Sequence, residues 1–584
     1  MKSEEMAALI RVALGDEKAD LVITGGSLVN VYTGELLKGY AVAVKGKRIA
    51  YVGQDAGHTI GTATKVIDAT GKIIVPGFID SHTHMTPYTV YEFLRYAPRG
   101  GTTTIITEML DISFALGFRG TLEFLESCRD QPIKMFGVVP TMVSLSPRFD
   151  TEALSKEQIR ELLQREDVLG LGETYWFPVV EQEPRFLELF EEAFKAGKKV
   201  TGHSAGARGN KLIAYAAGGV CSCHEPITAA EVLERLRLGM YVPSREGEIR
   251  KDLEAIAEIK DMDLDLRQFI LATDGTSTKQ ILEKGYMEVV LEKAIALGFD
   301  PITAIQMVTL NPAQYLNLDD RLGGIAPGKF ADIVILPDLQ NIKAEYVISN
   351  GRIIAQNREM LVQPRKHAYP EWARQSIRLA PTFTPEDFMI HVSGTSSTAQ
   401  VRAIEQIAEL VTSELRLEVP VSRGKITANL EQDLIKVAAI DFLDVKGEKF
   451  VGLLKGFKLQ KGAIASSTAW DLANIVAVGV DEKDLALAVN RIIEMQGGAV
   501  VCADGRVLAE FSMPIGGCLS SAPLETLFQK TEEFQRAAAA LGSPFQDTHL
   551  TLITLTTPAI PFFRLCEKGL VDIRTNEMFG LLVN

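Results

Sequence analysis

Histidine is rare in this chain, and four of its eight histidines lie where a metal ion could use them. His82 and His84 are separated by one residue, so on an extended strand both imidazoles point to the same side and can bind one cation. At this composition a His-x-His pair is expected by chance only about 0.1 times. His203 and His224 each follow a later short apolar run. The spacing therefore predicts a metal site.

Two carboxylates occupy equivalent positions, because Glu173 and Asp274 also end apolar runs. Four imidazoles and two carboxylates are enough ligands for two divalent cations, with Glu173 as the natural bridge between them. Two cations would lower the pKa of a shared water enough to supply hydroxide near neutral pH. Asp274 would accept the proton from that water and pass it to the leaving group. The candidate catalytic residues are Asp274, Glu173 and His224. The residues predict hydrolysis at a carbon that bears a nitrogen leaving group.

Short strands alternating with helices must bring these six residues together. Eight apolar runs read as buried strands, separated by segments of helical periodicity. Because the carboxyl ends of barrel strands meet at one mouth, the placement predicts an α/β protein with a (β/α)8 TIM-type barrel. A doubly wound open sheet is the competing arrangement. The runs are 73–79, 102–106, 135–139, 168–171, 199–201, 219–222, 239–242 and 269–272.

Antiparallel β signals precede and follow the barrel. The alternation of β-rich runs and glycine turns between positions 19 and 75 returns around 323–355, where Asn350-Gly351 marks a turn. Both flanks are therefore expected to form one small β-sandwich domain with the barrel inserted into it. A proline-rich stretch predicts a linker before a C-terminal α+β domain. The expected boundaries are 1–75 with 321–370 for the sandwich, 76–320 for the barrel, 371–390 for the linker and 391–584 for the last domain.

Within the C-terminal domain, the pattern of apolar residues predicts two helices and two strands. The helices are expected over 401–417 and 482–496. The strands are expected near 434–439 and 498–502.

Composition excludes several classes of function. Lys+Arg 61 against Asp+Glu 75 gives a net charge of -14, which repels nucleic-acid backbones and anionic lipids. No run approaches the roughly 18 to 20 apolar residues that a bilayer span needs. The N-terminus lacks a signal-peptide pattern. The spacing of the six cysteines is not that of a disulfide framework. We expect a cytoplasmic homo-oligomer, a dimer or higher, with a small heterocyclic substrate and no nucleic-acid or membrane partner.

Several motifs together resemble the amidohydrolase superfamily and, within it, the adenine deaminase family. The resemblance extends over nearly the whole chain, and a glutamate on the fourth strand fits this family. The resemblance implies conversion of adenine, or a modified adenine, to hypoxanthine and ammonia in purine metabolism. It also implies a dinuclear manganese or iron site. The ligand types themselves would accept zinc as well. The motifs are Pro76-Gly-Phe-Ile-Asp-Ser-His82-Thr-His84, Leu171-Gly-Glu173, Gly202-His203, Cys223-His224-Glu225, Thr273-Asp274 and Ala326-Pro-Gly-Lys-Phe-Ala-Asp332.

The chain departs from the family pattern in segments expected to surround the substrate. Met85-Thr-Pro-Tyr-Thr89 replaces an Ile-Glu-Ser-Ser segment, and Thr107-Glu-Met-Leu-Asp111 replaces Asp-Pro-His-Glu. In the C-terminal domain, Trp470-Asp-Leu-Ala-Asn474 replaces His-Asp-Ser-His-Asn. Such polar groups discriminate between substrates through paired hydrogen bonds, so these changes concern which base is accepted.

Three residues near the proposed ligands are candidates for contacting the substrate. Glu225 follows His224 directly, where a surface role is the alternative. Arg245 could bind a carboxylate or ring carbonyl of the substrate, or form a salt bridge within the protein. Tyr175 begins an aromatic run that could stack on a flat heterocycle or pack in the core.

Two other functions stay open from the sequence alone. One is a cyclic amidohydrolase that opens a hydantoin or lactam ring, which an assay for ammonia release would distinguish from a deaminase. The other is a non-catalytic protein that binds a ligand without turnover. A purified protein without bound metal would favour this function.

Overall fold

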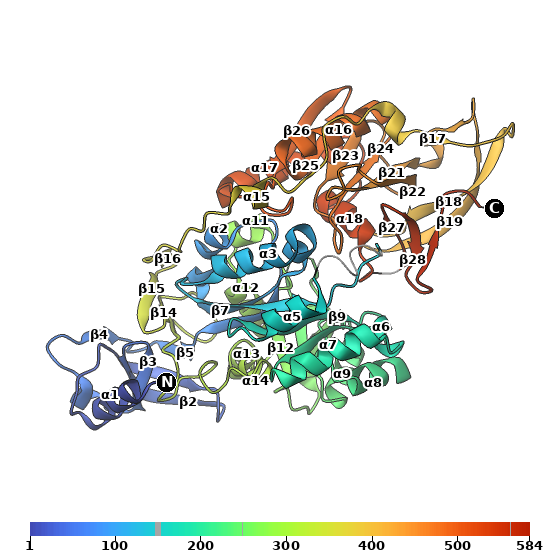
Figure 1. The fold of residues 1–584 in the computed structure, drawn as a ribbon. Helices are drawn as coiled ribbons and strands as arrows, with labels where there is room; N and C mark the ends of the chain where they lie inside the picture. Colours follow the sequence, from blue (N-terminus) through green and yellow to red (C-terminus); the bar gives the residue numbers. More distant parts are fainter. Residues whose placement is uncertain (147–153, 248, 561, 584) are drawn as a thin grey trace.

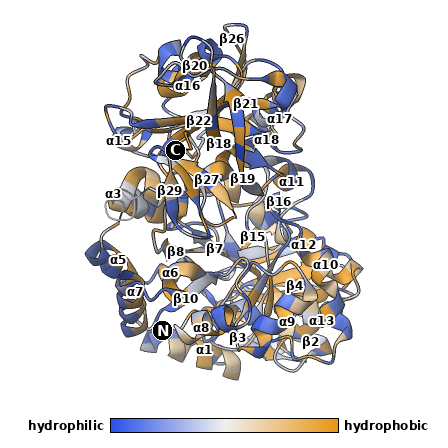
Figure 2. Ribbon diagram, turned by 90° about the vertical axis from the view of Figure 1, so that its right-hand side faces the viewer, coloured by the Kyte–Doolittle hydropathy of each residue, from blue (hydrophilic) through white to orange (hydrophobic). Residues whose placement is uncertain are grey.

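The computed structural model describes residues 1–146, 154–247, 249–560 and 562–583. Figure 1 shows three parts along the chain: a blue N-terminal sheet, a blue-to-green central part, and an orange-to-red C-terminal part. The C-terminal part lies against the central part on the side away from the N-terminal sheet, and the view turned by 90° in Figure 2 agrees.

Strands from both flanks of the central part form one nine-stranded sheet. β5 (Ile73–Pro76) pairs antiparallel with β13 (Ile333–Leu336), although more than 250 residues separate them in the chain. Next to this pair, the Gly77 amide donates to the Asp332 carbonyl at 2.9 Å. The other strands are β1 (Leu21–Asn30), β2 (Glu35–Lys45), β3 (Arg48–Gly53), β4 (Lys65–Asp68), β14 (Tyr346–Ser349), β15 (Arg352–Gln356) and β16 (Glu359–Met360).

The central part is a parallel sheet curled into a barrel. Five of its strands pair in chain order, and two more pair with each other. A segment around Cys221 joins these two groups, because the Cys221 amide donates to Val200 O and the Tyr241 amide donates to Cys221 O, both at 2.9 Å. The Asp274 amide donates to His82 O at 3.0 Å and closes the ring. The strands are β6 (Phe78–Thr83), β7 (Thr102–Glu108), β8 (Lys134–Pro140), β9 (Val168–Tyr175), β10 (Lys199–His203), β11 (Val242–Arg245) and β12 (Phe269–Ala272).

The predicted α/β class is confirmed, with three differences in the strands. The strand predicted over 239–242 begins only at Val242 and continues to Arg245. The run 73–79 is divided at Gly77, so its first half belongs to the nine-stranded sheet and its second half to the barrel. The run 219–222 forms no regular strand and is joined to its neighbours by the two hydrogen bonds of Cys221 and an isolated bridge between Ser222 and Tyr241. Gly219, with φ +96°, interrupts the extended backbone there.

Amphipathic helices cover the outside of the barrel. In α7 (Pro184–Lys195) the buried residues Phe186, Leu189, Phe190 and Ala193 recur at helical spacing, and Figure 2 shows hydrophilic residues on this surface helix. Among the helices of the described residues, none combines the length and apolar character that a bilayer span requires. The others up to position 320 are α1 (Ser3–Leu14), α2 (Val90–Leu94), α3 (Leu110–Cys128), α5 (Lys156–Leu163), α6 (Trp176–Val180), α8 (Asn210–Ala217), α9 (Ala229–Arg237), α10 (Leu253–Ile256), α11 (Thr278–Glu283), α12 (Met287–Ala296), α13 (Pro301–Met307) and α14 (Leu310–Tyr315).

The C-terminal part is built on an eight-stranded sheet in the order β19-β18-β22-β21-β24-β23-β25-β26. Helix α16 packs on β23 and β25, and α17 packs on β25 and β26. The elements are α15 (Glu371–Arg374), β17 (Ile390–His391), β18 (Thr398–Gln406), β19 (Thr412–Pro420), β20 (Lys425–Ile426), β21 (Leu434–Asp441), β22 (Lys449–Lys455), β23 (Ala463–Ser466), β24 (Asn474–Gly479), α16 (Glu482–Met495), β25 (Gly498–Ala503), β26 (Arg506–Ser512), α17 (Leu524–Ala540), α18 (Thr548–Ile553), β27 (Phe563–Cys566), β28 (Gly569–Asp572) and β29 (Glu577–Phe579).

The helix predicted over 401–417 is wrong, because these residues form the antiparallel pair β18 and β19, in which Val401 faces Leu417. In β19 apolar Leu415, Leu417 and Val419 alternate with charged residues, and this period of two is typical of a strand. The helix predicted over 482–496 is confirmed as α16, and both predicted strands are found as β21 and β25.

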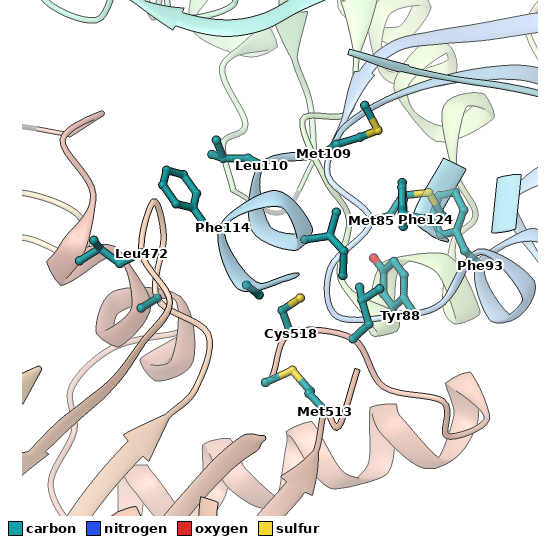
Figure 3. Packing of buried hydrophobic residues seen from close by; sticks show 14 of the residues in the cluster. Met85, Tyr88, Phe93, Met109, Leu110, Phe114, Phe124, Leu472, Met513 and Cys518 are labelled. Atoms are coloured by element: carbon teal, nitrogen blue, oxygen red, sulfur yellow. The ribbon is translucent and has the colours of Figure 1, made fainter. Parts of the chain in front are cut away.

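An apolar interface fixes the C-terminal part over the mouth of the barrel. Figure 3 shows side chains of the loops and helices that follow β6 and β7 facing residues of the C-terminal part. The Ser520 amide also donates to Pro87 O across this interface at 2.7 Å. Both walls are buried, so burial of apolar surface holds the two parts together. The side chains include Met85, Tyr88, Leu110 and Phe114 on the barrel side, and Leu472, Met513 and Cys518 on the other.

Candidate metal centre

The carboxyl ends of β6, β9 and β12 bring His82, His84, Glu173 and Asp274 together. Their candidate ligand atoms all lie within 4.8 Å of one another. His82 Nε2 is 3.1 Å from Asp274 Oδ1, and His84 Nε2 is 3.1 Å from Glu173 Oε1. Three strand ends that meet at the barrel mouth produce this first cluster.

A second cluster lies beside it and consists of His203, His224 and Glu225, again with candidate ligand atoms within 4.8 Å of one another. Glu225 Oε1 is 3.2 Å from His203 Nε2 and 3.3 Å from His224 Nε2. The sequence assigned Glu225 to substrate contact, whereas the structure places its carboxylate between two imidazoles. Its position directly after a strand-end histidine was the only signal for this role.

Glu173 joins the two clusters into one site. Its Oε1 atom lies 3.3 Å from His82 Nε2 and 3.5 Å from His224 Nε2, in addition to its contact with His84. The imidazoles of His82 and His224 are stacked, with ring centroids 4.1 Å apart. The structure therefore brings all six residues that the sequence singled out as metal ligands into a single cluster.

The electrostatics of the site fit bound cations. Burial opposes charge on the imidazoles, but Glu173 raises the pKa of His84 and Glu225 raises the pKa of His203, each to about 9. Burial likewise opposes charge on Glu173, yet the neighbouring histidines hold its pKa well below the usual range. Buried carboxylates at this density require nearby positive charge. Divalent cations would supply that charge in place of the protonated imidazoles, and the mixture of imidazole nitrogen and carboxylate oxygen suits them.

Glu108, at the end of β7, is a buried residue that the sequence placed only within a segment around the substrate and to which it gave no role at the metal ligands. Its Oε1 lies 3.3 Å from His82 Nδ1, on the side of the imidazole away from Asp274. Burial raises the pKa of Glu108. A carboxylate behind a metal-binding histidine fixes the tautomer and the orientation of the ring. Glu108 is therefore placed to orient His82, and its position at the end of a predicted strand was the available signal.

Arg245 is engaged by carboxylates of the protein itself. Its Nε atom donates a hydrogen bond to Asp252 Oδ2 at 3.0 Å, and its guanidinium forms an ion pair with Glu225. Nη1 is also 3.6 Å from Asp274 Oδ2. Burial opposes charge on Glu225, but Arg245 contributes to holding its pKa well below the usual range. Arg245 thus positions the second cluster in addition to lining the cavity described below.

Replacing Arg245 with methionine is expected to lower the free energy of unfolding by about 3–5 kcal/mol, because Glu225 and Asp252 would each lose a close cationic partner while their carboxylates stay buried. Urea unfolding of the metal-depleted full-length protein measures this loss. Arg267, whose side chain is 75% exposed, provides the matched control Arg267→Met, expected to change stability by less than about 0.5 kcal/mol. Equal stabilities for the two variants would show that the Arg245 ion pairs do not stabilise the fold.

A cavity of about 290 Å³ opens beside both clusters. The three predicted substrate contacts, Arg245, Glu225 and Tyr175, all line it. The Tyr175 hydroxyl donates to the Asp471 carboxylate, with both oxygens at 3.1 Å. Burial raises the pKa of Asp471 to about 7. The C-terminal part contributes further wall residues. Trp470 and Asp471 belong to the segment that the sequence placed around the substrate, and the residues that the sequence did not assign to the site are Leu410, Val411, Ala559 and Ile560.

Comparisons with known proteins agree with this architecture. Residues 73–354 match the model of the amidohydrolase family, and residues 409–577 match that of the adenine deaminase C-terminal domain. Adenine deaminase of Moorella thermoacetica is 37% identical over 99% of this chain and 98% of its own length. Adenine deaminase of Cenarchaeum symbiosum is 36% identical over 99% of this chain and 95% of its own. Adenine deaminase 3 of Rhizobium meliloti is 34% identical over 100% of this chain and 99% of its own length. By this full-length similarity, the chain belongs to the adenine deaminase family.

Proposed function

We propose that this protein is a metal-dependent aminohydrolase that converts adenine, or a modified adenine, to hypoxanthine and ammonia. Full-length similarity to adenine deaminases supports the reaction class. The observation that carries the proposal is the contact of Glu173 with both histidine clusters beside a cavity at the barrel mouth. Two adjacent cations beside a cavity open to a small molecule would supply an activated water for hydrolytic removal of an amine.

The ligands proposed for the two cations are His82, His84, Glu173, His203, His224 and Asp274, and Glu225 lies where it could add to the second cluster. Manganese or iron is the proposed native metal, because the resemblance to adenine deaminases implies it. Zinc is the alternative, since imidazole nitrogen and carboxylate oxygen accept all three metals. When bound, the cations supply Lewis-acid activation of water and of the substrate.

Asp274 is the proposed proton shuttle. Burial opposes its charge, but the hydrogen bond from His82 and the charge of Arg245 lower the pKa of Asp274, so it is a carboxylate at neutral pH. It accepts a proton as a water oxygen bonds to the ring carbon that carries the amine. It then gives this proton to the amine nitrogen as the carbon–nitrogen bond breaks and ammonia leaves. When the oxygen adds, the electron pair of the ring carbon–nitrogen double bond moves to the ring nitrogen, which takes up the second proton of the water. The carbon–oxygen double bond of hypoxanthine then forms as ammonia leaves.

The test is ammonia release by the full-length protein loaded with Mn²⁺, assayed with adenine, N6-substituted adenines and related bases. We expect turnover of at least one of these at about 1–10³ s⁻¹, loss of activity on chelation, and recovery when metal is restored. A hydantoin and a lactam belong in the same panel. Ring opening without ammonia release would replace the proposal with the cyclic amidohydrolase, and a protein that retains no metal would favour a binding role.

A further inference from the structure

Trp470 is an aromatic residue that the C-terminal part places at the metal centre. It lies in the turn between β23 and β24 and lines the cavity, with its side chain only partly buried. Its indole is nearly parallel to the imidazole of His84, with an angle of 17° between the rings and 6.4 Å between their centroids. An aromatic face from one part of the chain thus stands beside a candidate metal ligand from another.

The surrounding hydrogen bonds hold this turn in place. The Trp470 amide donates to Ile553 O at 3.1 Å, and its carbonyl accepts from the Thr556 hydroxyl at 2.8 Å. The neighbouring Asp471 is tied to the barrel, because its carbonyl accepts from the Ser144 hydroxyl at 2.8 Å and its carboxylate accepts from Tyr175. These bonds fix the backbone that carries the indole, so the turn has little main-chain freedom to lose when a ligand binds against it.

We propose that Trp470 is a specificity-determining residue that stacks on the flat ring of a purine bound at the metal centre. The inference rests on the proposed function and specifies its substrate class as planar heteroaromatic bases. Stacking on an aromatic side chain contributes about ten- to hundredfold in affinity for a base. Apolar Leu110, Val411 and Ile560 line the same cavity and favour the same kind of ligand. Saturated cyclic amides lack the extended π-face that such stacking needs and should gain less.

The experiment compares Trp470→Leu with Trp470→Phe in the full-length protein loaded with Mn²⁺. Trp372→Phe is the matched control, because Trp372 stacks on Arg119 and does not line the cavity. Calorimetry gives the Kd of purine, which lacks the reacting amine, and kinetics give KM and kcat for adenine. Metal content and thermal stability are measured for each variant.

We expect Trp470→Leu to raise both the Kd of purine and the KM of adenine about ten- to hundredfold. Trp470→Phe should lose less, because it keeps an aromatic face, and Trp372→Phe should change neither constant. Bound metal should be the same in all variants. If Trp470→Leu fails to fold, Trp470→His replaces it, and its smaller ring should bind purine more weakly than Phe.

Unchanged purine affinity in Trp470→Leu, or in the replacement, overturns the inference, as does a wild-type protein that does not bind purine. An equal loss in Trp372→Phe would also overturn it, because the effect would then be unspecific. Failure of the proposed function is recognised separately. In that case adenine and its relatives release no ammonia, while purine binding still depends on residue 470.

Discussion

Asp274→Asn is expected to lower kcat on the true substrate by about 10²- to 10⁴-fold while leaving the metal content largely intact. The asparagine keeps the size of the side chain and one oxygen to face His82, but it cannot accept a proton. Asp274 is 3% exposed, so no solvent molecule replaces it without rearrangement of the site. Steady-state kinetics together with metal analysis of the purified variant measure both quantities.

Asp320→Asn is the matched control for this substitution, because the Asp320 side chain is 77% exposed on the surface and should leave kcat unchanged. An Asp274→Asn protein with unimpaired turnover would remove Asp274 from its role as proton shuttle. A variant that lost its metal together with its activity would instead assign Asp274 chiefly to metal binding.

Glu173→Gln is expected to reduce the bound metal from two ions to about one per chain and to abolish most activity. A single oxygen of Glu173 contacts three histidines that belong to both clusters. The neutral amide removes the negative charge that two adjacent cations need between them. Metal analysis after dialysis, with ammonia release measured on the same samples, tests this expectation.

Glu254→Gln on the exposed side of α10 serves as the control and should keep both ions. Two ions per chain in Glu173→Gln would show that the clusters bind metal independently. In that case the bridging role would be wrong even if activity fell.

The site residues whose positions were predictable from the sequence are those that directly follow a predicted strand. Histidine is rare, and each of His82, His203 and His224 follows a short apolar run, so one rule of barrel geometry places them together. The parallel strands of the barrel follow from the same pattern, because buried strands read as continuous apolar runs. Cytoplasmic location and homo-oligomeric assembly stay predictions from the sequence.

Other features depend on contacts between distant residues and could not be derived from local pattern. Glu108 and Trp470 lie in segments that the sequence placed around the substrate, but their contacts with His82 and His84 come from burial and from docking between parts of the chain, which no short-range spacing records. Glu225 was noticed, but its contacts with two histidines depend on the ion pair with Arg245. The segment 401–417 was misassigned because residues of both periodicities occur in it, and pairing across a hairpin decided between them.

The bond from the Gly77 amide to the Asp332 carbonyl places the entry and the exit of the barrel side by side. Because its two ends adjoin, the barrel is an inserted domain between two neighbouring strands of the nine-stranded sheet. Such adjoining ends favour exchange or circular permutation of a domain as a single piece. A relative's barrel could therefore be grafted between β5 and β13 without changing how those two strands pair.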